Sequence, residues 1–408
     1  MIYPKYATEF RCLGSSCEDT CCNGWNVVID QGTYEKYQTL PASPLRTLID
    51  GSIRRKPAKD GDSPSAFAFI QMEPPAGCPM QSAEGLCRVH TELGPNYLSD
   101  LCSSFPRATC TVDDIKIETL SLGCPEAVRL VLREPDLLTS KGLGTGYLTW
   151  DDKPAKPRDL RAYFWPIREF VVTLLQNRSY ALWQRMFLLG TFCRRLEAVI
   201  RNEVEGGYAA MESGFSAAIA SGGLRDSLAT IPAHNAHQLD MVLHLIKSPA
   251  VNGTVSPRYS ECLNSFMKGI GDASVTTFEE QAAAYAAAYE RFYAPFFQKH
   301  PYMLENLLTD MVFHTSFPFG AELINPETTV QPVRQFADLA VVFALIKGLL
   351  IGVAGSHREA FSFDHVVQTI QVIVKRFGHT PEFRNYSQEL LNSKGLNDAQ
   401  GLTMLLRN

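Results

Sequence analysis

Cysteine is the residue type with the clearest chemical potential in this sequence, because nine of its eleven cysteines fall within the first 124 residues. Thiolates ligate zinc and iron–sulfur clusters, and pairs of thiols form disulfides. The other two cysteines, Cys193 and Cys262, stand alone in segments with a helical pattern. The nine clustered cysteines are Cys12, Cys17, Cys21, Cys22, Cys78, Cys87, Cys102, Cys110 and Cys124. Their concentration predicts a metal site or a disulfide framework in the first third of the chain.

A disulfide framework is the weakest of the three explanations for this block. Such frameworks support short secreted chains whose cores are too small to fold alone. This chain has 408 residues, its cysteine count is odd, and its start, MIYPKYATEF, contains no apolar run typical of a signal peptide. We therefore expect the cysteines to bind a metal.

The spacing of the cysteines does not separate zinc from an iron–sulfur cluster. Structural zinc takes four thiolate or imidazole ligands, often from two close pairs. Cys17 and Cys21 make one close pair, but no second pair is equally tight. An iron–sulfur cluster also takes thiolates and tolerates irregular spacing. Both metals stay open on this ground.

Local sequence ranks the individual thiols. Cys21 and Cys22 are adjacent, so their side chains diverge, which suits a cluster better than a single ion. Cys124 precedes Pro125 and an apolar-periodic run, which predicts a helix N-cap where free amides favour a thiolate. Cys110 lacks such a setting and is expected to be a bystander. The expected metal ligands are drawn from Cys17, Cys21, Cys22, Cys78, Cys87, Cys102 and Cys124.

Several segments of this chain resemble the flagellin lysine-N-methylases. The segments are FRCLGSSCEDTCCNGW, CPMQSAEGLCRVHTELG, LCSSFPR, LSLGCPEAVRL and, later, HPYMLENLLTDMVFHTSFPFG. Those bacterial enzymes share the cysteine block with a broader group of zinc- or iron-chelating proteins. The resemblance is specific in the cysteine block and looser in the helices. It implies a cytoplasmic enzyme that methylates lysine side chains of flagellin, with S-adenosylmethionine as methyl donor and a 4Fe–4S cluster.

Composition sets bounds on partners and on the number of domains. The net charge of −5 and the pI of about 6.0 give no broad basic surface for nucleic acid. The length predicts about two domains. A segment rich in Gly, Asp, Lys and Pro at 139–158 predicts their boundary. We expect a cysteine-rich metal-binding domain at 1–150 and an α-helical domain at 151–408.

The first domain is predicted to be a small α+β unit. Strands are expected at 25–29, 66–72 and 114–122, and Asp30 is expected to cap a helix. The polar segment 51–65 predicts a loop. Residues 86–104 predict helix that is broken at Gly94-Pro95.

The second domain is predicted to be a helical bundle, which makes the fold mainly α. Apolar residues at three- and four-residue spacing predict its helices. The run FADLAVVFALIKGLLIGVAG approaches the length of a membrane span, but Asp338 and Lys347 interrupt it, so we expect a buried helix. The predicted helices cover 159–176, 179–203, 208–220, 234–247, 277–298, 302–313, 332–354, 363–377 and 386–391.

No usual motif for the methyl donor is found. A Gly-rich turn after a first parallel strand is absent, and Cys17-x3-Cys21 only begins the C-x3-C-x2-C pattern of radical enzymes. A cluster with an open iron would still bind the donor, and Arg107 is the candidate partner for the donor's carboxylate.

Glu305, Asn306 and His314 are predicted to line a cleft or to join a core network. His90 follows Cys87 at helical spacing, but is expected to be a surface histidine.

Two functions of different classes therefore remain. The first is a lysine methyltransferase with a metal cluster, acting on a flagellar protein. The second is a metal-binding interaction or redox-sensing protein without methyltransferase activity.

Overall fold

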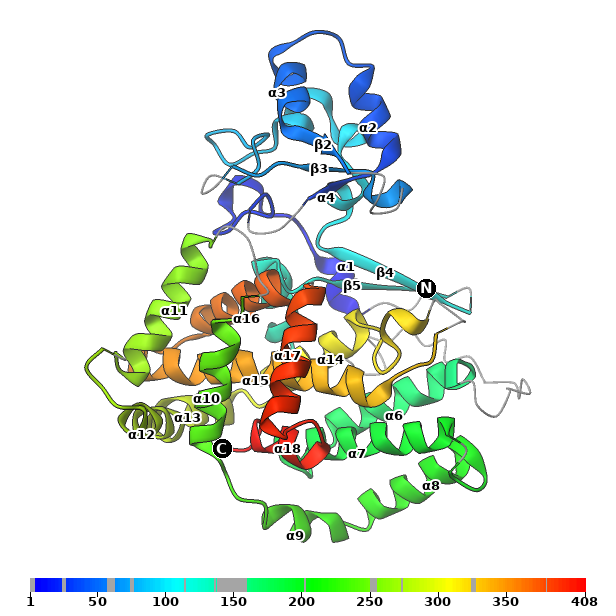
Figure 1. Cartoon of the computed structure of the whole chain (residues 1–408), viewed down its shortest axis with the longest axis vertical. Helices are drawn as coiled ribbons and strands as arrows, with labels where there is room; N and C mark the ends of the chain where they lie inside the picture. The colour runs from blue at the N-terminus through cyan, green and yellow to red at the C-terminus, as the bar shows by residue number, and fades with distance from the viewer. Residues whose placement is uncertain are drawn as a thin grey trace.

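The protein is mainly helical, with two small antiparallel sheets in its N-terminal third (Figure 1). The computed structural model describes residues 4–23, 27–56, 63–73, 77–113, 115–135, 137, 160–201, 203–249, 255–272, 274–323, 328–378 and 380–408. The prediction of a mainly α fold with a small α+β segment first is confirmed. The predicted boundary at 139–158 lies outside the described residues, so the domain division stays a prediction.

The first sheet has the strand order β1-β3-β2, with Val28 paired to Phe69 and Ile53 to Ile70. Side chains from Val27 to Val89 form a hydrophobic cluster of their own around it. This unit lies at one end of the molecule (Figure 1). Its elements are β1 Val28–Ile29, α2 Gln31–Gln38, α3 Pro44–Ser52, β2 Ile53–Arg55, η3 Pro64–Ala66, β3 Ala68–Ile70, η4 Val89–Leu93, η5 Pro95–Tyr97 and α4 Asp100–Ser104.

Three predictions for this unit can be compared with the structure. Asp30 caps α2, accepting a hydrogen bond from the Thr33 backbone, as predicted. The predicted break at Gly94 is confirmed, because its φ of 90° ends the helical turn η4. The predicted loop at 51–65 is wrong in its first part, because Ile53 pairs with β3 and makes residues 53–55 a strand. Trp25 lies outside the described residues.

The rest of the N-terminal third packs with the large helical part. It comprises α1 Lys5–Glu9, η1 Gly14–Ser16, the hairpin of β4 Arg107–Val112 and β5 Ile115–Leu120, and α5 Pro125–Arg133. Tyr6, Leu120 and Val128 belong to the same hydrophobic cluster as the C-terminal helices. Strand β4 was not predicted, although polar and apolar residues alternate along its sequence RATCTV, and in the structure it pairs with β5.

The predicted helices of the C-terminal part are present, and three further α-helices occur, namely α9, α11 and α18. Helix α11 was not predicted, although Ser256 caps it and buried residues recur at 259, 262, 266 and 270. The elements are η6 Leu160–Tyr163, α6 Phe164–Gln176, α7 Leu182–Ile200, α8 Gly207–Ala220, α9 Gly223–Ala229, α10 Asn235–Ile246, α11 Pro257–Ile270, α12 Phe278–Ala288, η7 Tyr289–Tyr293, α13 Ala294–Lys299, α14 Tyr302–His314, η8 Gly320–Leu323, α15 Pro332–His357, η9 Arg358–Ala360, α16 Phe363–Phe377, α17 Pro381–Lys394 and α18 Ala399–Met404.

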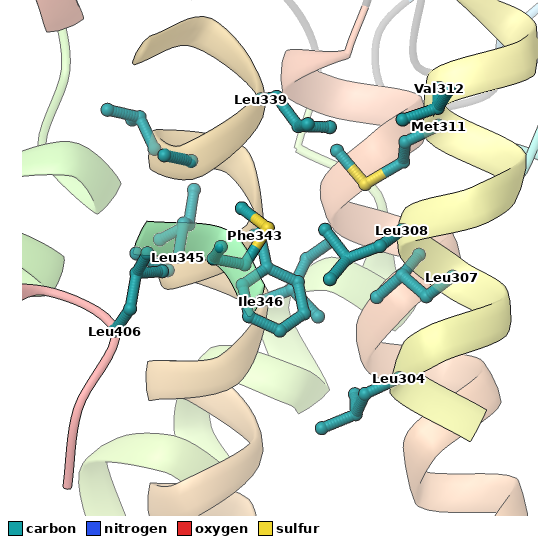
Figure 2. Close-up of a cluster of buried hydrophobic side chains, with 14 of the residues drawn as sticks. Leu304, Leu307, Leu308, Met311, Val312, Leu339, Phe343, Leu345, Ile346 and Leu406 are labelled. Carbon is teal, nitrogen blue, oxygen red and sulfur yellow. The ribbon is translucent and has the colours of Figure 1, made fainter. Parts of the chain in front are cut away.

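Helix α15 is the centre of the helical core. It contacts α7, α10, α11, α12 and α16. Of its most apolar stretch of 18 residues, 89% is buried inside the protein, as in the core helix of a soluble protein. Gly352 lets α11 approach closely, because a Cβ there would lie 2.3 Å from the Phe266 ring. Figure 2 shows Phe343 and Ile346 of α15 opposite Leu304 and Leu308 of α14. The length and hydropathy of α15 are therefore explained by burial among its neighbours.

Helix α14 is buried together with its polar residues. The Glu305 carboxylate accepts hydrogen bonds from Arg178, at 2.9 and 3.1 Å, and from Arg185, at 2.7 Å. The Asn306 amide donates to the carbonyls of Val131 and Glu134 at the end of α5, at 2.9 and 2.7 Å. Of the two interpretations of these residues, the structure supports the core network, because their partners join α14 to α5 and α7.

Asp310 ties the N-terminal helix to the same core. Its carboxylate accepts a hydrogen bond from the Tyr6 hydroxyl of α1. Burial raises the pKa of Asp310 to about 7, and the bond from Tyr6 opposes that shift. A carboxyl group at this position is therefore half protonated near neutral pH.

Substituting Glu305→Gln is expected to lower the free energy of unfolding by ~3–5 kcal/mol, because Arg185 would remain buried without its counter-charge. Urea denaturation measures this change. Glu203→Gln, which removes an exposed ion pair with Arg201, is the matched control and is expected to leave stability nearly unchanged. Equal changes in the two variants would contradict the analysis.

The stability of the native protein relative to Asp310→Asn is expected to fall as pH rises. The folded-state pKa of about 7 lies above the usual 3.8, so the folded protein holds this proton more tightly than the unfolded chain. The stabilisation that comes from protonated Asp310 is complete below pH ~4 and is lost as the pH rises through the folded-state pKa. The free energy of unfolding falls by roughly 2 kcal/mol between pH 5 and pH 7 for this reason. Urea denaturation of both proteins at pH 5, 6, 7 and 8 measures it. If the free energies of unfolding of the two proteins changed with pH in parallel, the raised pKa of Asp310 would be excluded.

Candidate metal centre

Four separate segments bring cysteines into the region beside the small sheet. Cys21 and Cys22 lie in a turn before β1, Cys78 and Cys87 flank the turn after β3, and Cys102 lies in α4. The amide of Cys78 donates to the carbonyl of Cys22 at 2.8 Å, which fixes these two segments together. Gly77 makes this approach possible, because a Cβ there would lie 2.9 Å from the Cys22 carbonyl oxygen.

These thiols form a first group, as their mutual electrostatic effects indicate. Burial raises the pKa of Cys78 to about 12 and the pKa of Cys102 to about 11, and it also raises the pKa of Cys87. It is the largest cause of each shift. The negative charge of Cys22 adds to each of these shifts. Such effects require the sulfur atoms to lie near one another. Cys22, Cys78, Cys87 and Cys102 are thus gathered in one place.

Cys21 and Cys22 differ in spite of being adjacent. The Cys21 thiol donates a hydrogen bond to Cys22, and this bond is the largest cause that raises the pKa of Cys21 and lowers that of Cys22. The prediction that the side chains of Cys21 and Cys22 diverge is wrong, because their two thiols are hydrogen-bonded to each other.

A second group consists of Cys12, Cys17 and Cys124. Burial is the largest cause that raises the pKa of Cys17 and the pKa of Cys124, and the charge of Cys12 raises both further. Cys124 stands at the N-cap of α5, as predicted. The expectation that this position favours a thiolate is wrong for the free thiol: the amides of Ala127 and Glu126 lower its pKa, but burial prevails and raises it to about 12.

The remaining cysteines belong to neither group. Cys110 lies on β4, and its charge acts on Arg168 of α6. Cys193 and Cys262 are buried in α7 and α11. All eleven cysteines lie in described residues, and all are free thiols, so the structure contains no disulfide.

The described residues contain no set of three or more His, Cys, Asp or Glu side chains arranged to hold a metal ion. A zinc site needs four ligands that each contact one ion at about 2.0–2.3 Å. An iron–sulfur cluster is a larger body whose thiolates ligate different irons. The choice between zinc and a cluster stays a prediction.

The other predicted site residues have protein partners or solvent around them. Arg107 begins β4, and its guanidinium donates to the Phe10 carbonyl at 3.3 Å and lies 3.7 Å from Glu118. Its role in donor binding stays a prediction. His90 is exposed on η4, as expected for a surface histidine. His314 lies 3.2 Å from the Thr119 hydroxyl of β5.

No donor-binding fold of the common methyltransferase type occurs in the part of the chain that the structure describes. Its two sheets are antiparallel, whereas that fold binds the donor at the edge of a parallel sheet. A polar pocket of about 770 Å³ lies between α7, α15 and α17, and no cysteine lines it. Glu197, Arg201, Arg334 and Glu389 contribute its charges. Its lining suits a polar ligand, but the sequence analysis did not identify it.

The polar residues that hold the loop of Cys17, Cys21 and Cys22 were not predicted from the sequence. Gln371 and Lys375 both donate hydrogen bonds to the Asp19 carboxylate, which lies more than 350 positions earlier in the chain. Gln371 could have been noticed, because it is a polar residue at a buried helical position between Val367 and Val374.

Comparisons with known proteins give a consistent result. The profile of the FliB lysine N-methylase C-terminal domain matches residues 168–405. A lysine-N-methylase of Salmonella typhimurium strain LT2 is 25% identical over 396 residues, which covers 93% of this chain and 92% of that protein. The corresponding protein of Salmonella choleraesuis is 24% identical over 392 residues, with the same coverage. The flagellar biosynthetic protein FliU of Salmonella muenchen is 36% identical over 136 residues, or 33% of this chain and 78% of FliU. No solved structure matches significantly.

Replacing Cys78, Cys87 or Cys102 by Ser is expected to abolish metal binding, because each belongs to the first group of thiols. Cys110→Ser is expected to retain the metal, because Cys110 belongs to neither group. Metal per chain is measured by mass spectrometry on protein purified without oxygen. Cys193→Ser, at a buried position in α7, is the matched control for the loss of a thiol as such. Equal losses at Cys78, Cys87, Cys102 and Cys110 would refute this ranking.

Proposed function

This chain belongs to the FliB lysine N-methylase family, and we propose on that basis that it methylates lysine side chains of flagellin. The observation that carries the proposal is the similarity to two lysine-N-methylases over 93% of the chain. The name of FliU adds a flagellar context for one relative. Flagellin is the substrate that the sequence resemblance implies.

We propose S-adenosylmethionine as the methyl donor. In a polar transfer, the methyl carbon leaves the sulfonium sulfur, which keeps the electron pair of the broken C–S bond. The lysine nitrogen forms the new C–N bond with its lone pair, so it must first lose a proton. S-adenosylhomocysteine is the product. Arg107 is the proposed partner of the donor's carboxylate, although its contacts with Phe10 and Glu118 would then have to rearrange.

We propose further that the first group of thiols holds a 4Fe–4S cluster. Cys22, Cys78, Cys87 and Cys102 come from four segments, lie near one another and supply the ligand type such clusters require. If only three of these four thiols ligated the cluster, the fourth iron would offer a coordination position to the amino-acid part of the donor. Zinc is the alternative metal for the same thiols.

We propose a cytoplasmic location for this activity, as the sequence resemblance implies. No disulfide joins any of the eleven cysteines, all of which lie in described residues, and this agrees with a reducing compartment. The proposed substrate is a protein, and the pI of about 6.0 does not favour nucleic acid.

Incubating the anaerobically purified protein with flagellin and methyl-labelled S-adenosylmethionine is expected to place label on flagellin lysines. Cys78→Ser is expected to reduce labelling at least about tenfold, because loss of a ligand releases the cluster. Cys193→Ser is the matched control and is expected to label as the native protein does. Mass spectrometry of flagellin peptides measures the product.

The same preparation distinguishes the alternatives. Iron with matching sulfide, together with labelling, supports the proposal in full. Iron without labelling would favour the redox-sensing or interaction protein. Zinc without iron would make the cysteine block a structural element and would contradict the cluster.

A further inference from the structure

The loop that contains the first cysteines has no hydrophobic core. No residue from Arg11 to Cys22 is buried, and its regular structure is the three-residue turn η1. Apolar burial orders this loop only at its end, where the partly buried Cys22 packs against the hydrophobic cluster of the small sheet. Polar contacts with other parts of the chain fix the rest of the loop.

Lys375 of α16 makes the first of these contacts. Its ammonium donates to the Asp19 carboxylate at 2.8 Å and to the Thr20 carbonyl at 2.8 Å. Both side chains of this ion pair are only 9% exposed, so solvent screens it little. The positive charge of Lys375 also lowers the pKa of Cys22, behind the hydrogen bond from Cys21 as the largest cause.

Gln371, one turn earlier on α16, joins three segments. Its amide nitrogen donates to the Asp19 carboxylate at 2.7 Å and to the Gly123 carbonyl at 3.1 Å. Its oxygen accepts from Arg258 of α11 at 3.1 Å. Because Gly123 directly precedes Cys124, one fully buried side chain links the loop of Cys17 to the turn of Cys124.

Glu18 makes the third contact. Its carboxylate pairs with Arg129 of α5 and lies 3.5 Å from Arg258. The two adjacent acidic residues of the loop, Glu18 and Asp19, are thus held by basic and amide groups from three helices.

We propose that Gln371 and Lys375 are positioning residues, which fix the Cys17–Cys22 loop against the helical domain and so set where its thiols stand. The inference rests on the proposed function for the identity of these thiols as cluster ligands. The fixed position itself follows from the contacts and needs neither metal nor substrate. It gives α16, which contains no cysteine, a direct part in building the thiol site.

The test measures how fast iodoacetamide alkylates each cysteine of the full-length protein, with peptides resolved by mass spectrometry. Lys375→Met and Gln371→Met are expected to accelerate alkylation of the half-buried Cys17 by about tenfold, because the loop loses buried polar partners. Lys375→Arg, which keeps the charge, is expected to recover part of the protection. In protein purified with its metal, the first two variants are also expected to release the metal faster to a chelator.

Two controls make the test specific. Lys394→Met removes a more exposed lysine–aspartate ion pair, with Asp240 at 2.6 Å, that touches no cysteine, and it is expected to leave every rate unchanged. Cys193, buried in α7, reports global unfolding and is expected to stay protected in all variants. Asp19→Asn removes the ion pair between Asp19 and Lys375 by a change in the loop and not in α16, so no packing of the helical core is lost.

Selective acceleration in Lys375→Met, Gln371→Met and Asp19→Asn, with Cys193 protected, would support the proposal. Alkylation rates equal to those of Lys394→Met would overturn the proposal. Acceleration that includes Cys193 in all three variants would also overturn it. Because the alkylation assay is repeated on metal-free protein without flagellin, a failure of the methylation or cluster proposals would leave its result interpretable.

Discussion

Apolar packing around α15 places the helices on which the thiol site depends. This helix is buried among α7, α11 and α16, and close approach of α11 at Gly352 fixes their spacing. Helices α11 and α16 then present Arg258, Gln371 and Lys375 at one end of the core. The hydrophobic effect therefore acts on the cysteines indirectly, since it orders the helices whose polar side chains hold the cysteine loop.

Polar groups buried at helix contacts give the core its specific arrangement. Glu305 and Asp310 on α14 bind partners on segments far away in the sequence, namely Arg178, Arg185 and Tyr6. Each such group must be satisfied when it leaves water, so a different packing of α14 would be costly. The N-terminal helix α1 and the C-terminal helices thereby form one core, while the small sheet keeps a hydrophobic cluster of its own.

The division of the thiols into two groups bears on the chemistry. Cys22, Cys78, Cys87 and Cys102 offer one set of four thiols, beside the small sheet. Cys12, Cys17 and Cys124 stand apart from it, at the start of α5. The loop between Cys17 and Cys21 connects the two groups, and its acidic residues contact the helical domain. In this chain, the region that matches the FliB C-terminal domain model, residues 168–405, contacts the loop that contains Cys17, Cys21 and Cys22.

The sequence by itself determined the concentration of cysteines, most helices, the cap at Asp30, the helix start after Cys124 and the resemblance to lysine methylases. These features are local, because they depend on residue type and on spacing within one turn or one segment. Strands β2 and β4, the sorting of the thiols and the roles of Asp19, Gln371 and Lys375 were decided only by the tertiary structure. A short strand is defined by its partner, and a hydrogen bond across more than 350 positions leaves no periodic pattern in the sequence. The burial that raises the pKa of Cys124, against the effect of its helix, likewise exists only once the core has formed.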